Sequence, residues 1–593
     1  MGFGKTFLAC LLAIVVGSIL SFFFTIFIIA GFVSSISFLA SEPVTIEKNS
    51  IVMIDLSKPI VETSSVKFAD NFDFDSFSLK KNITTFEAVS MIDAAAEDPL
   101  IAGIYIKVSP TVEASLPTLY EVREALGRFR KNSVDKFIVA YGDTYSKEAL
   151  YLCSVADKVY LNPAGAVDWS GMSATSVFFK GTLDKLGVEP EIIRHGKFKG
   201  AVEPFILDKM SDENRLQMQG IVSSTWNHVV DQIALSRSLS ADTLQLLASD
   251  LRITSASDAM KAGLVDSIFY RDQLQTNLER LTGESELRLL TLNDYARSGK
   301  SMNGDLSSPN KVAVVYASGD IVDMGDPATQ IVGNDLAALI AKVRKDKDIK
   351  AMVLRVNSPG GSALASEVVR REVELTKKEK PVVVSMGEYA ASGGYWISTP
   401  ADAIVAAPTT LTGSIGVFGL MFNVEKGARE KLGVTFDVVR TNPSADLGSI
   451  CRPLTRAERL VIQNGVDTTY NQFIEHVALG RRMNPQKVDS LGGGRVWSGL
   501  QALENGLVDK IGGMNDAIIL AAEKAGITSY RISRMTGESG NSFSQILQDL
   551  SRASIGWAFG LDSKVSDAAV EIQNLFKEQG VKAAMENKII FNL

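Results

Sequence analysis

The sequence is poor in the residues that build disulfide frameworks, metal sites and histidine-based active sites. Its 593 residues include three histidines and three cysteines, and no two cysteines have the spacing of metal ligands. Three cysteines are too few for a framework of disulfide bridges. Because no pair has metal-ligand spacing, we also expect no structural metal. The cysteines are Cys10, Cys153 and Cys451.

The sequence also lacks an excess of basic residues. Its 61 lysines and arginines against 68 acidic residues give a formal net charge of −7. Such a balance gives no reason to expect a nucleic-acid partner. Hydrophobic residues make up 46% of the chain. A chain of this length is sufficient for more than one domain with a full core.

Charge is absent from one long stretch near the N-terminus. No charged residue occurs from Thr6 to Ser41, which is rich in Phe, Leu, Ile and Val. The stretch exceeds the roughly 20 residues that cross a bilayer, so it predicts a transmembrane helix. A cleaved signal peptide has small residues before its cut, whereas Phe38 and Leu39 stand here, so a retained anchor is favoured. Lys5 before the span and Glu42 after it weakly place the rest of the chain outside the cytoplasm.

Beyond this span the chain repeats itself. A pattern of strands and helices recurs at a spacing of about 245 residues. KLGVEPEIIR at Lys185–Arg194 matches KLGVTFDVVR at Lys431–Arg440, and the block Gly142–Pro163 aligns with Gly387–Pro408 without a gap. We therefore predict two similar α/β domains in tandem.

The predicted organisation has six parts, separated by changes in composition. The linker between the two domains is polar and rich in glycine and serine. The parts are a cytoplasmic N-terminus (1–5), a membrane anchor (6–41), a first α/β domain (42–295), the linker (296–310), a second α/β domain (311–540) and a C-terminal tail (541–593).

One stretch of the second half, KPVVVSMGEYAASGGYWIST, places a small nucleophile between a strand and a helix. The apolar run Pro381–Ser385 predicts a buried strand, and Gly393 and Gly394 directly follow Ser392 at the expected helix start. The first N–H groups of a helix have no partner within it and can hold an oxyanion. This stretch alone is equally consistent with close packing of small residues.

A second strand end supplies possible donors. The stretch AMVLRVNSPGGS, Ala351–Ser362, predicts a strand that ends in a Ser-Pro-Gly-Gly turn. Ligands of open α/β sheets bind at such strand ends. The two stretches together predict an acyl-transfer site with Ser392 as nucleophile and N–H donors from Gly393 and from Gly360 or Gly361.

The first half has lost this site. Lys147 stands at the position of Ser392, and Thr111-Val112 replaces the two glycines of the turn. The first half carries instead a stretch unlike its partner, HGKFKGAVEPF at His195–Phe205. The two halves are therefore predicted to be complementary.

The site still needs a base that takes the proton of the serine, most often a histidine and sometimes a neutral lysine. His195 could act as this base only if it approached Ser392 with an acidic side chain to orient it. Lys199, aligned with about Ala445 in the second half, has apolar neighbours such as Phe198, and desolvation lowers the pKa of a lysine. Composition alone favours a solvated basic loop for Lys197 and Lys199.

These features together resemble the family of signal peptide peptidase A, also called protease IV, in its long two-domain form. The resemblance covers nearly the whole chain to about residue 540 and rests on the single span, the repeat and the motifs GKFKGAVEPF, NSPGGS, AASGGYWIS and TLTGSIG. NSPGG alone is weak, because the Clp protease and enoyl-CoA hydratase folds share it. The resemblance implies two Clp/crotonase-like α/β superhelix domains.

The resemblance also implies roles and a reaction. It implies Ser392 as nucleophile, Lys199 as general base, Ser414 as a supporting hydroxyl, and oxyanion N–H donors on Gly393 and on Gly360 or Gly361. The implied enzyme is a Ser/Lys serine endopeptidase without a cofactor, which cleaves apolar peptides, chiefly signal-peptide remnants. The implied assembly is a homotetramer, anchored by a single span in the inner membrane with its catalytic body on the periplasmic side.

Two other functions stay open at this point. A crotonase-like acyl-CoA enzyme uses the same two-donor turn, although a membrane anchor argues against it because acyl-CoA is cytoplasmic. A catalytically inactive scaffold would use the repeat for assembly, although each expected catalytic position is filled.

Overall fold

The computed structural model describes residues 44–63, 82–299 and 304–535, with the short segments 16–17, 72–73, 78–79, 580–584 and 590–592. The predicted anchor, apart from 16–17, and most of the predicted tail therefore lie outside the described residues. Within the described ranges, no helix is both long and apolar enough to cross a membrane. The predicted domain limits 42–295 and 311–540 stay predictions.

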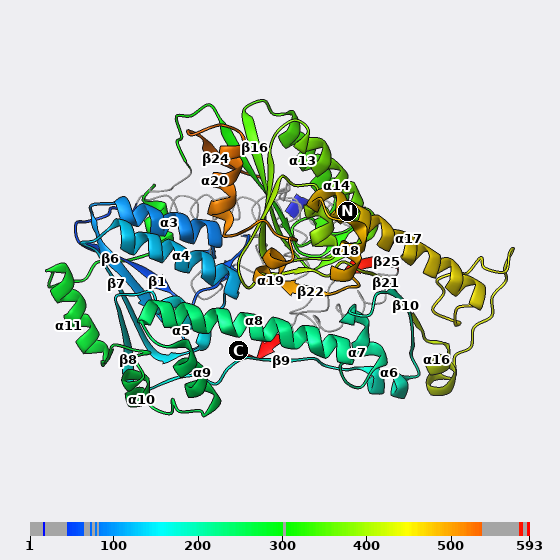
Figure 1. Ribbon diagram of the computed structural model, residues 1–593, viewed down its shortest axis with the longest axis horizontal. Coiled ribbons are helices and arrows are strands. Elements are labelled where there is room, and N and C mark those ends of the chain that lie inside the picture. Colours follow the sequence, from blue (N-terminus) through cyan, green and yellow to red (C-terminus); the bar gives the residue numbers. More distant parts are fainter. Residues whose placement is uncertain are drawn as a thin grey trace, which may run out of the picture.

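The first half is built on a six-stranded parallel sheet in the order β11-β8-β7-β6-β1-β12 (Figure 1). Its central strands are continuous apolar runs, as expected for strands covered on both faces. The strands are β1 (Ser50–Asp55), β6 (Ile101–Lys107), β7 (Phe137–Tyr145), β8 (Lys158–Val167), β11 (Ser267–Ile268) and β12 (Leu289–Thr291).

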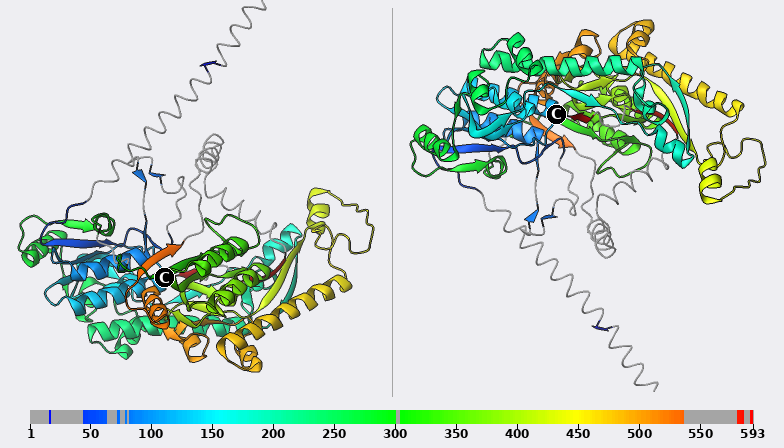
Figure 2. Two further views of the ribbon diagram at one scale, coloured as in Figure 1. Left: turned by 90° about the horizontal axis from the view of Figure 1, so that it is seen from above. Right: turned by 90° about the horizontal axis from the view of Figure 1, so that it is seen from below.

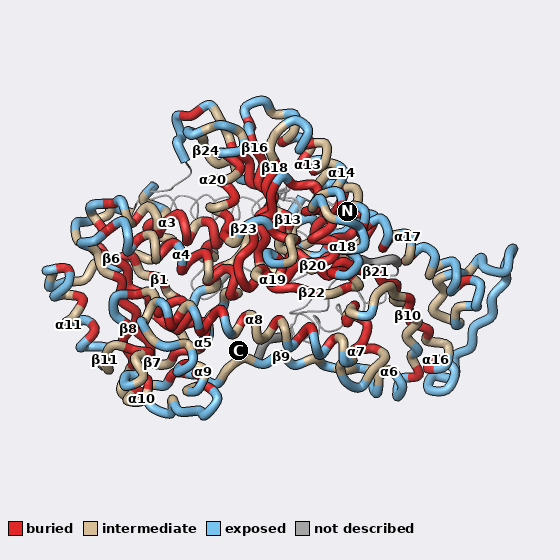
Figure 3. Tube along the Cα trace, in the orientation of Figure 1, coloured by how far each residue is buried: buried red, intermediate tan, exposed pale blue. Residues whose placement is uncertain are grey.

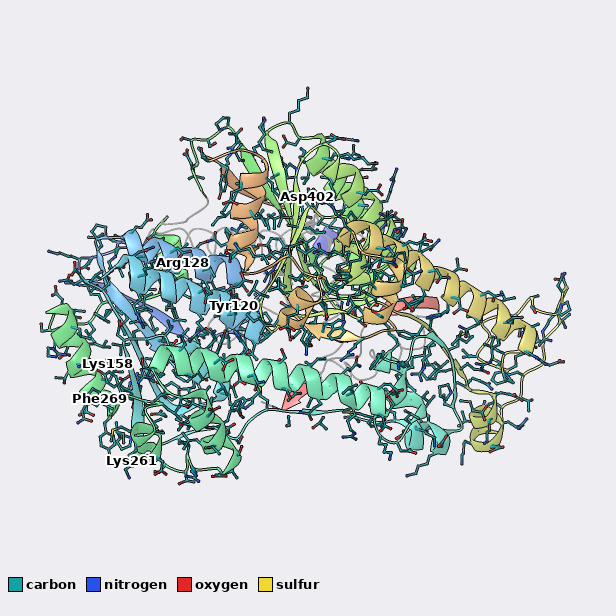
Figure 4. The ribbon with its side chains drawn as sticks, in the orientation of Figure 1. Tyr120, Arg128, Lys158, Lys261, Phe269 and Asp402 are labelled. Atoms are coloured by element: carbon teal, nitrogen blue, oxygen red, sulfur yellow. The ribbon has the colours of Figure 1, made fainter. Side chains whose placement is uncertain are left out.

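Several helices of the first half start at clear capping signals. α3 (Thr85–Glu97) has a capping box formed by Thr84 and Glu87, and α4 (Leu116–Asn132) follows the N-cap Ser115 with a proline in its first turn. Arg128 and Tyr120, labelled in Figure 4, belong to α4, and Arg128 donates to Asp93 of α3 at 2.8 and 3.0 Å. The others are α5 (Lys147–Cys153), α6 (Lys180–Leu186), α7 (Glu203–Ile206), α8 (Asp212–Arg237), α9 (Ala241–Ser249), α10 (Ala256–Lys261), α11 (Arg271–Thr282), α12 (Leu292–Arg297) and the 3₁₀ turn η1 (Gly200–Val202).

The second half repeats this sheet strand for strand. Its path β24-β13-β16-β18-β19-β23 follows the same order as β12-β1-β6-β7-β8-β11, with β20 and β22 added beside β18. This confirms the predicted tandem of two α/β domains. The strands are β13 (Lys311–Ser318), β16 (Ile349–Ser358), β18 (Val382–Ala391), β19 (Ala403–Ala406), β20 (Leu411–Gly413), β22 (Val496–Ser498), β23 (Lys510–Ile511) and β24 (Arg531–Met535).

The helices of the second half cover both faces of its sheet, and the sheet strands are buried in both halves (Figure 3). In both views of Figure 2, the two halves lie side by side and α8 runs along one face of the pair, where Ser224 contacts Ser498 at 2.8 Å. The helices are α13 (Gly333–Lys345), α14 (Ala363–Lys377), α15 (Gly393–Ser398), α16 (Glu425–Leu432), α17 (Arg456–Arg481), α18 (Pro485–Leu491), α19 (Gly499–Glu504) and α20 (Met514–Lys524).

A third sheet joins the two halves. Strand β10 (Glu189–His195) of the first half pairs antiparallel with β21 (Val417–Asn423) of the second half, in a sheet of order β10-β21-β25-β17-β14-β15. The remaining members are β14 (Ile321–Val322), β15 (Ile331–Val332), β17 (Gly360–Ser362) and β25 (Gly580–Ala584). Short strands elsewhere are β2 (Ile60–Val61), β3 (Phe72–Asp73), β4 (Ser78–Leu79), β5 (Ile83–Thr84), β9 (Ser173–Thr175) and β26 (Ile590–Asn592).

A buried ion triad also joins the halves. Arg355 on β16 is 1% exposed and donates to Glu62 at 2.6 and 3.0 Å and to Glu121 of α4 at 2.7 Å. Glu121 also accepts from the backbone N–H of Met514 at 2.8 Å. Since an unpaired buried charge is costly, these contacts favour one relative placement of the two halves.

Candidate active site

The candidate nucleophile stands at a strained junction between a strand and a helix. Ser392 follows β18 and is the N-cap of α15, with φ 54° and ψ −113°, a conformation that residues with a side chain rarely adopt. Its N–H donates to the carbonyl oxygen of Gly413 at 2.8 Å, and its hydroxyl does not cap the helix. The side chain is fully buried, so the junction directs the hydroxyl inward.

The hydroxyl of Ser392 meets a lysine of the first half. Lys199 follows β10, is 1% exposed, and places its Nζ 2.9 Å from Ser392 Oγ. The same amine lies 3.1 Å from Ser414 Oγ and 3.2 Å from the Ser414 carbonyl oxygen. The pairing of β10 with β21 carries Lys199 to this place. The solvated loop that composition favoured for Lys199 is therefore wrong.

Ser414 lies in a turn on the other side of the Lys199 amine. It directly follows β20, has φ 49°, and donates its N–H to the carbonyl oxygen of Arg495 at 2.7 Å. Its hydroxyl lies 3.4 Å from the carbonyl oxygen of Gly494. The amine of Lys199 is thus enclosed between the turns that carry Ser392 and Ser414.

A glycine run that the sequence motifs above do not include packs directly on Lys199. A Cβ on Gly494 would lie 2.7 Å from the Cα and Cβ of Lys199, and a Cβ on Gly416 would lie 3.3 Å from its Cδ. Gly493 accepts from the N–H of Phe198 at 2.9 Å. The three consecutive glycines at 492–494 were the available signal, but their partner is nearly 300 positions away.

The glycines that are predicted to supply oxyanion donors lie in tightly packed backbone. Gly360 and Gly361 have φ 110° and 151°, and a Cβ on Gly361 would lie 2.0 Å from the carbonyl oxygen of Ile321. A Cβ on Gly394 would lie 2.7 Å from the carbonyl oxygen of Ser358, so the glycine turn and the start of α15 are in contact. Gly393 is the first residue of α15, where an N–H has no partner within the helix. Any side chain at Gly361 or Gly394 would disturb this arrangement.

The rival base is engaged elsewhere. His195 places its Nδ1 2.7 Å from Asp467 Oδ1 on α17, and its ring stacks on Tyr470 with centroids 4.0 Å apart. The ammonium of Lys197 lies 5.5 Å from the ring centroid of Phe198. Among the three candidates, only Lys199 contacts Ser392 in the described part of the chain.

The corresponding place in the first half holds an ion pair. Lys147 follows β7 through the N-cap Ser146, is 3% exposed, and forms a very short contact with Asp168, which directly follows β8. Partial burial raises the pKa of Asp168, but hydrogen bonds from Lys147 and Ser170 outweigh it and hold that pKa below its usual value. The predicted equivalence of Lys147 with Ser392 is wrong by one residue, because Ser146 is the N-cap of α5 as Ser392 is the N-cap of α15. The hydroxyl of Ser146 accepts from the N–H of Ala149 at 3.2 Å, so the first half has a helix cap and an adjacent salt bridge where the second half has its serine.

Comparison with known families and proteins gives a consistent match. The model of peptidase family S49 matches twice, at residues 130–284 and 374–528. Protease 4 of Haemophilus influenzae is 36% identical over 84% of this chain and 83% of that protein, and Protease 4 of Salmonella typhi is 35% identical over 81% and 79%. The chloroplastic serine protease SPPA of Arabidopsis thaliana is 32% identical over 73% of this chain and 64% of that protein.

Solved structures match smaller parts of the chain. A variant of ClpP1 from Listeria monocytogenes is 14% identical with a TM-score of 0.24, covering 35% of this chain and 94% of that one. A variant of the membrane-bound stomatin-specific protease 1510-N is 15% identical with a TM-score of 0.25, covering 38% and 98%.

Proposed function

The chain belongs to peptidase family S49 as a serine peptidase, and we propose that Ser392 and Lys199 are the nucleophile and the general base of its peptide hydrolysis. The observation that carries this proposal is the 2.9 Å contact between Lys199 Nζ and Ser392 Oγ, two buried groups 193 positions apart in the sequence. A lysine accepts a proton only as the neutral amine, and burial away from water favours that form.

The proposed reaction has two halves that share one base. Lys199 takes the proton of Ser392, whose Oγ attacks the peptide carbonyl carbon; the C–N bond then breaks, and Lys199 returns the proton to the leaving amine. The product of this half is an ester on Ser392. Water then gives a proton to Lys199 and attacks the ester carbonyl, which releases the acid and restores the serine hydroxyl.

Two further groups have proposed supporting roles. The N–H of Gly393 together with that of Gly360 or Gly361 would hold the oxyanion, supported by the contact between the glycine turn and α15. Ser414 would hold the amine of Lys199 in line with Ser392, supported by its 3.1 Å contact with Nζ. The turn after β16, together with the strand order that the two halves share, also supports the finer proposal that both domains are Clp/crotonase-like superhelices.

The proposed substrates are apolar peptides, chiefly signal-peptide remnants left in a membrane. The uncharged stretch Thr6–Ser41 supports an anchor in the inner membrane, with the catalytic body on the periplasmic side. A substrate that stays in the bilayer is concentrated near an anchored enzyme. A homotetramer is proposed as the assembly.

The test is a cleavage assay with the full chain in detergent micelles and a synthetic signal peptide, with products identified by mass spectrometry. Ser392→Ala and Lys199→Ala are expected to lower kcat/KM by roughly 10³-fold or more. His195→Ala should stay within about threefold, because its ring does not reach the serine. Ser398→Ala is the matched control, since it also removes a fully buried hydroxyl, six positions further on.

Labelling with a fluorophosphonate separates the other functions. The wild type should be labelled on Ser392, and the Ser392→Ala variant should not. Activity lost in His195→Ala but kept in Lys199→Ala would overturn the assignment of the base. Acyl-CoA turnover that survives Ser392→Ala would indicate a crotonase-like enzyme, and a wild type that neither cleaves nor labels would indicate a scaffold.

A further inference from the structure

Arg355 lies beside both strands that end at the candidate active site. It belongs to β16, which ends three positions later at Ser358, before the glycine turn. The neighbouring strand β18 ends at Ala391, directly before Ser392. In the parallel pairing of these two strands, Arg355 faces Ser385. A single buried side chain therefore stands next to the strand of the proposed oxyanion turn and the strand of the proposed nucleophile.

The guanidinium of Arg355 makes five hydrogen bonds, as many as it has N–H groups. Three go to carboxylates of the first half, to Glu62 at 2.6 and 3.0 Å and to Glu121 at 2.7 Å. The other two go to β18, to the hydroxyl of Ser385 at 2.8 Å and the carbonyl oxygen of Met386 at 3.3 Å. Because the guanidinium is planar and rigid, these bonds fix β18 relative to β16 as well as the two acids.

The regular pairing of β16 with β18 ends at these contacts. It continues as far as Val356 and Met386, and resumes only at Ser358 and Ala390. Three residues of β18 therefore lie opposite one residue of β16. Such a bulge disrupts the ladder of backbone hydrogen bonds locally, so the geometry beyond it depends on what holds the strands before it. Arg355 holds them at the last two regular steps.

Beyond the bulge the two strand ends are packed without free space. A Cβ on Gly394 would lie 2.7 Å from the carbonyl oxygen of Ser358, and the Ser358 hydroxyl lies 3.2 Å from the N–H of Gly360. Ser358 and Ser392 are both fully buried. A shift of β16 along β18 would change the spacing between the turn glycines and Ser392. Stabilisation of an oxyanion is sensitive to such a shift.

The first half has no such arrangement at the equivalent position. IAGIYIKV at Ile101–Val108 aligns without a gap with IKAMVLRV at Ile349–Val356, which places Lys107 at the position of Arg355. The side chain of Lys107 is 45% exposed and pairs at 2.9 Å with Asp55 of its own half. The half without the serine site therefore has a partly exposed ion pair where the other half has the buried arginine.

A buried ion triad can also serve only to fix the placement of the two halves. The three bonds from Arg355 to Glu62 and Glu121 would be enough for that role. The two bonds to Ser385 and Met386 lie within the second half, so they do not join the halves. They connect the triad to the strand that leads to the nucleophile.

We propose that Arg355 is a positioning residue, which fixes the end of β16 against β18 and so sets the spacing between the turn glycines and Ser392. Glu62 and Glu121 orient its guanidinium. The first half thus contributes these two acids to the site in addition to Lys199. This proposal rests on the proposed function and adds to it a group that acts through the strands and not on the substrate.

Ser385→Ala is the sharpest test, because it removes one contact on β18 and leaves the ion triad intact. For the full chain in detergent micelles with a synthetic signal peptide, kcat should fall by about tenfold with KM within about twofold. Active sites are counted by complete fluorophosphonate labelling. Ser154→Ala is the matched control, since Ser154 is also fully buried and accepts from Arg123 at 2.8 Å, but in the first half. Its kcat should stay within about twofold.

A double-mutant cycle tests whether Arg355 and Ser385 act together. Arg355→Lys keeps the charge but lacks the fork that reaches both β18 and the acids, so kcat should fall by at least about tenfold. Adding Ser385→Ala should lower it by less than about twofold further. Lys107→Met, at the equivalent position, should change kcat by less than about twofold. Losses that multiply fully would overturn the proposal; if Arg355→Lys does not fold, Ser385→Ala alone decides.

Inhibition by a peptide aldehyde separates positioning from a loss of folded enzyme. Addition of the Ser392 hydroxyl to the aldehyde carbonyl gives a hemiacetal, whose oxygen occupies the place of the oxyanion. In Ser385→Ala the inhibition constant should rise about tenfold, in step with the fall in kcat. A merely structural role would leave this constant unchanged. Unchanged kcat and inhibition in Ser385→Ala, with cleavage lost in Ser392→Ala, would overturn this proposal and leave the proposed function intact.

Discussion

The two halves of the molecule have the same strand order and opposite contents at the same place. In the first half Lys147 is paired with Asp168; in the second half a lysine from the other half contacts the hydroxyls of Ser392 and Ser414. A carboxylate partner stabilises the positive charge of an amine more strongly than a neutral hydroxyl does. The same fold thus holds one buried lysine in a salt bridge and another beside two hydroxyls, and the second setting is the one that suits the proposed base.

The largest effect should come from removing each lysine in turn. Lys199→Met keeps the length of the side chain but has no amine, so kcat/KM should fall by roughly 10³-fold. Lys147→Met should change kcat/KM by less than about twofold, because its pair is outside the proposed reaction. The measurement is cleavage of a synthetic signal peptide by the full chain. An equal loss in both variants would mean that the two sites are not functionally distinct.

Acidic pH should lower the folding stability of the first half, because His228 is buried there. Burial, assisted by Arg123, lowers the pKa of His228 to about 4, and its Nε2 lies 3.1 Å from the hydroxyl of Tyr151. The unfolded chain then binds the proton more readily, so stability is complete above pH about 6.5 and falls as pH drops to about 4, by about 3 kcal/mol.

Urea unfolding at pH 7 and pH 4.5 measures this loss. His228→Gln cannot take a proton in this range, so its stability should change less between the two values than that of the wild type. Residues of the first half should show the loss of hydrogen-exchange protection first. Equal pH dependence in the variant and the wild type would assign the acid sensitivity to other groups.

The smallest effect should come from replacing Ser414. Ser414 occupies the position that Asp168 occupies in the first half, so this replacement tests the comparison between the surroundings of the two lysines. Ser414→Ala removes one contact to the amine of Lys199 and should lower kcat by about 10- to 100-fold with KM nearly unchanged. Ser414→Gly removes the same hydroxyl and relieves the positive φ, so it should be as slow but more stable than the alanine variant. A pH profile of kcat unchanged in both variants would mean that Ser414 does not act on the base.

The sequence predicted the parts of this site that are local and missed those that depend on distant packing. Ser392 with its two glycines follows an apolar strand in one short stretch, so its place at a helix start was readable. The composition around Lys199 favoured a solvent-exposed loop, because the serines that enclose it lie about 200 positions away. The three glycines at 492–494 are visible in the sequence, but nothing local identifies Lys199 as the partner of Gly494 or Glu62 as the partner of Arg355.

The backbone of Ser392 has a consequence for the stability of the two halves. Its conformation costs about 1–3 kcal/mol for a residue with a side chain, so the fold alone would be better served by glycine. In the first half the equivalent strain is gone: Lys147 begins α5 behind Ser146, an ordinary cap with φ −74°. The second half therefore has a conformational cost at Ser392 that the first half does not have at Ser146.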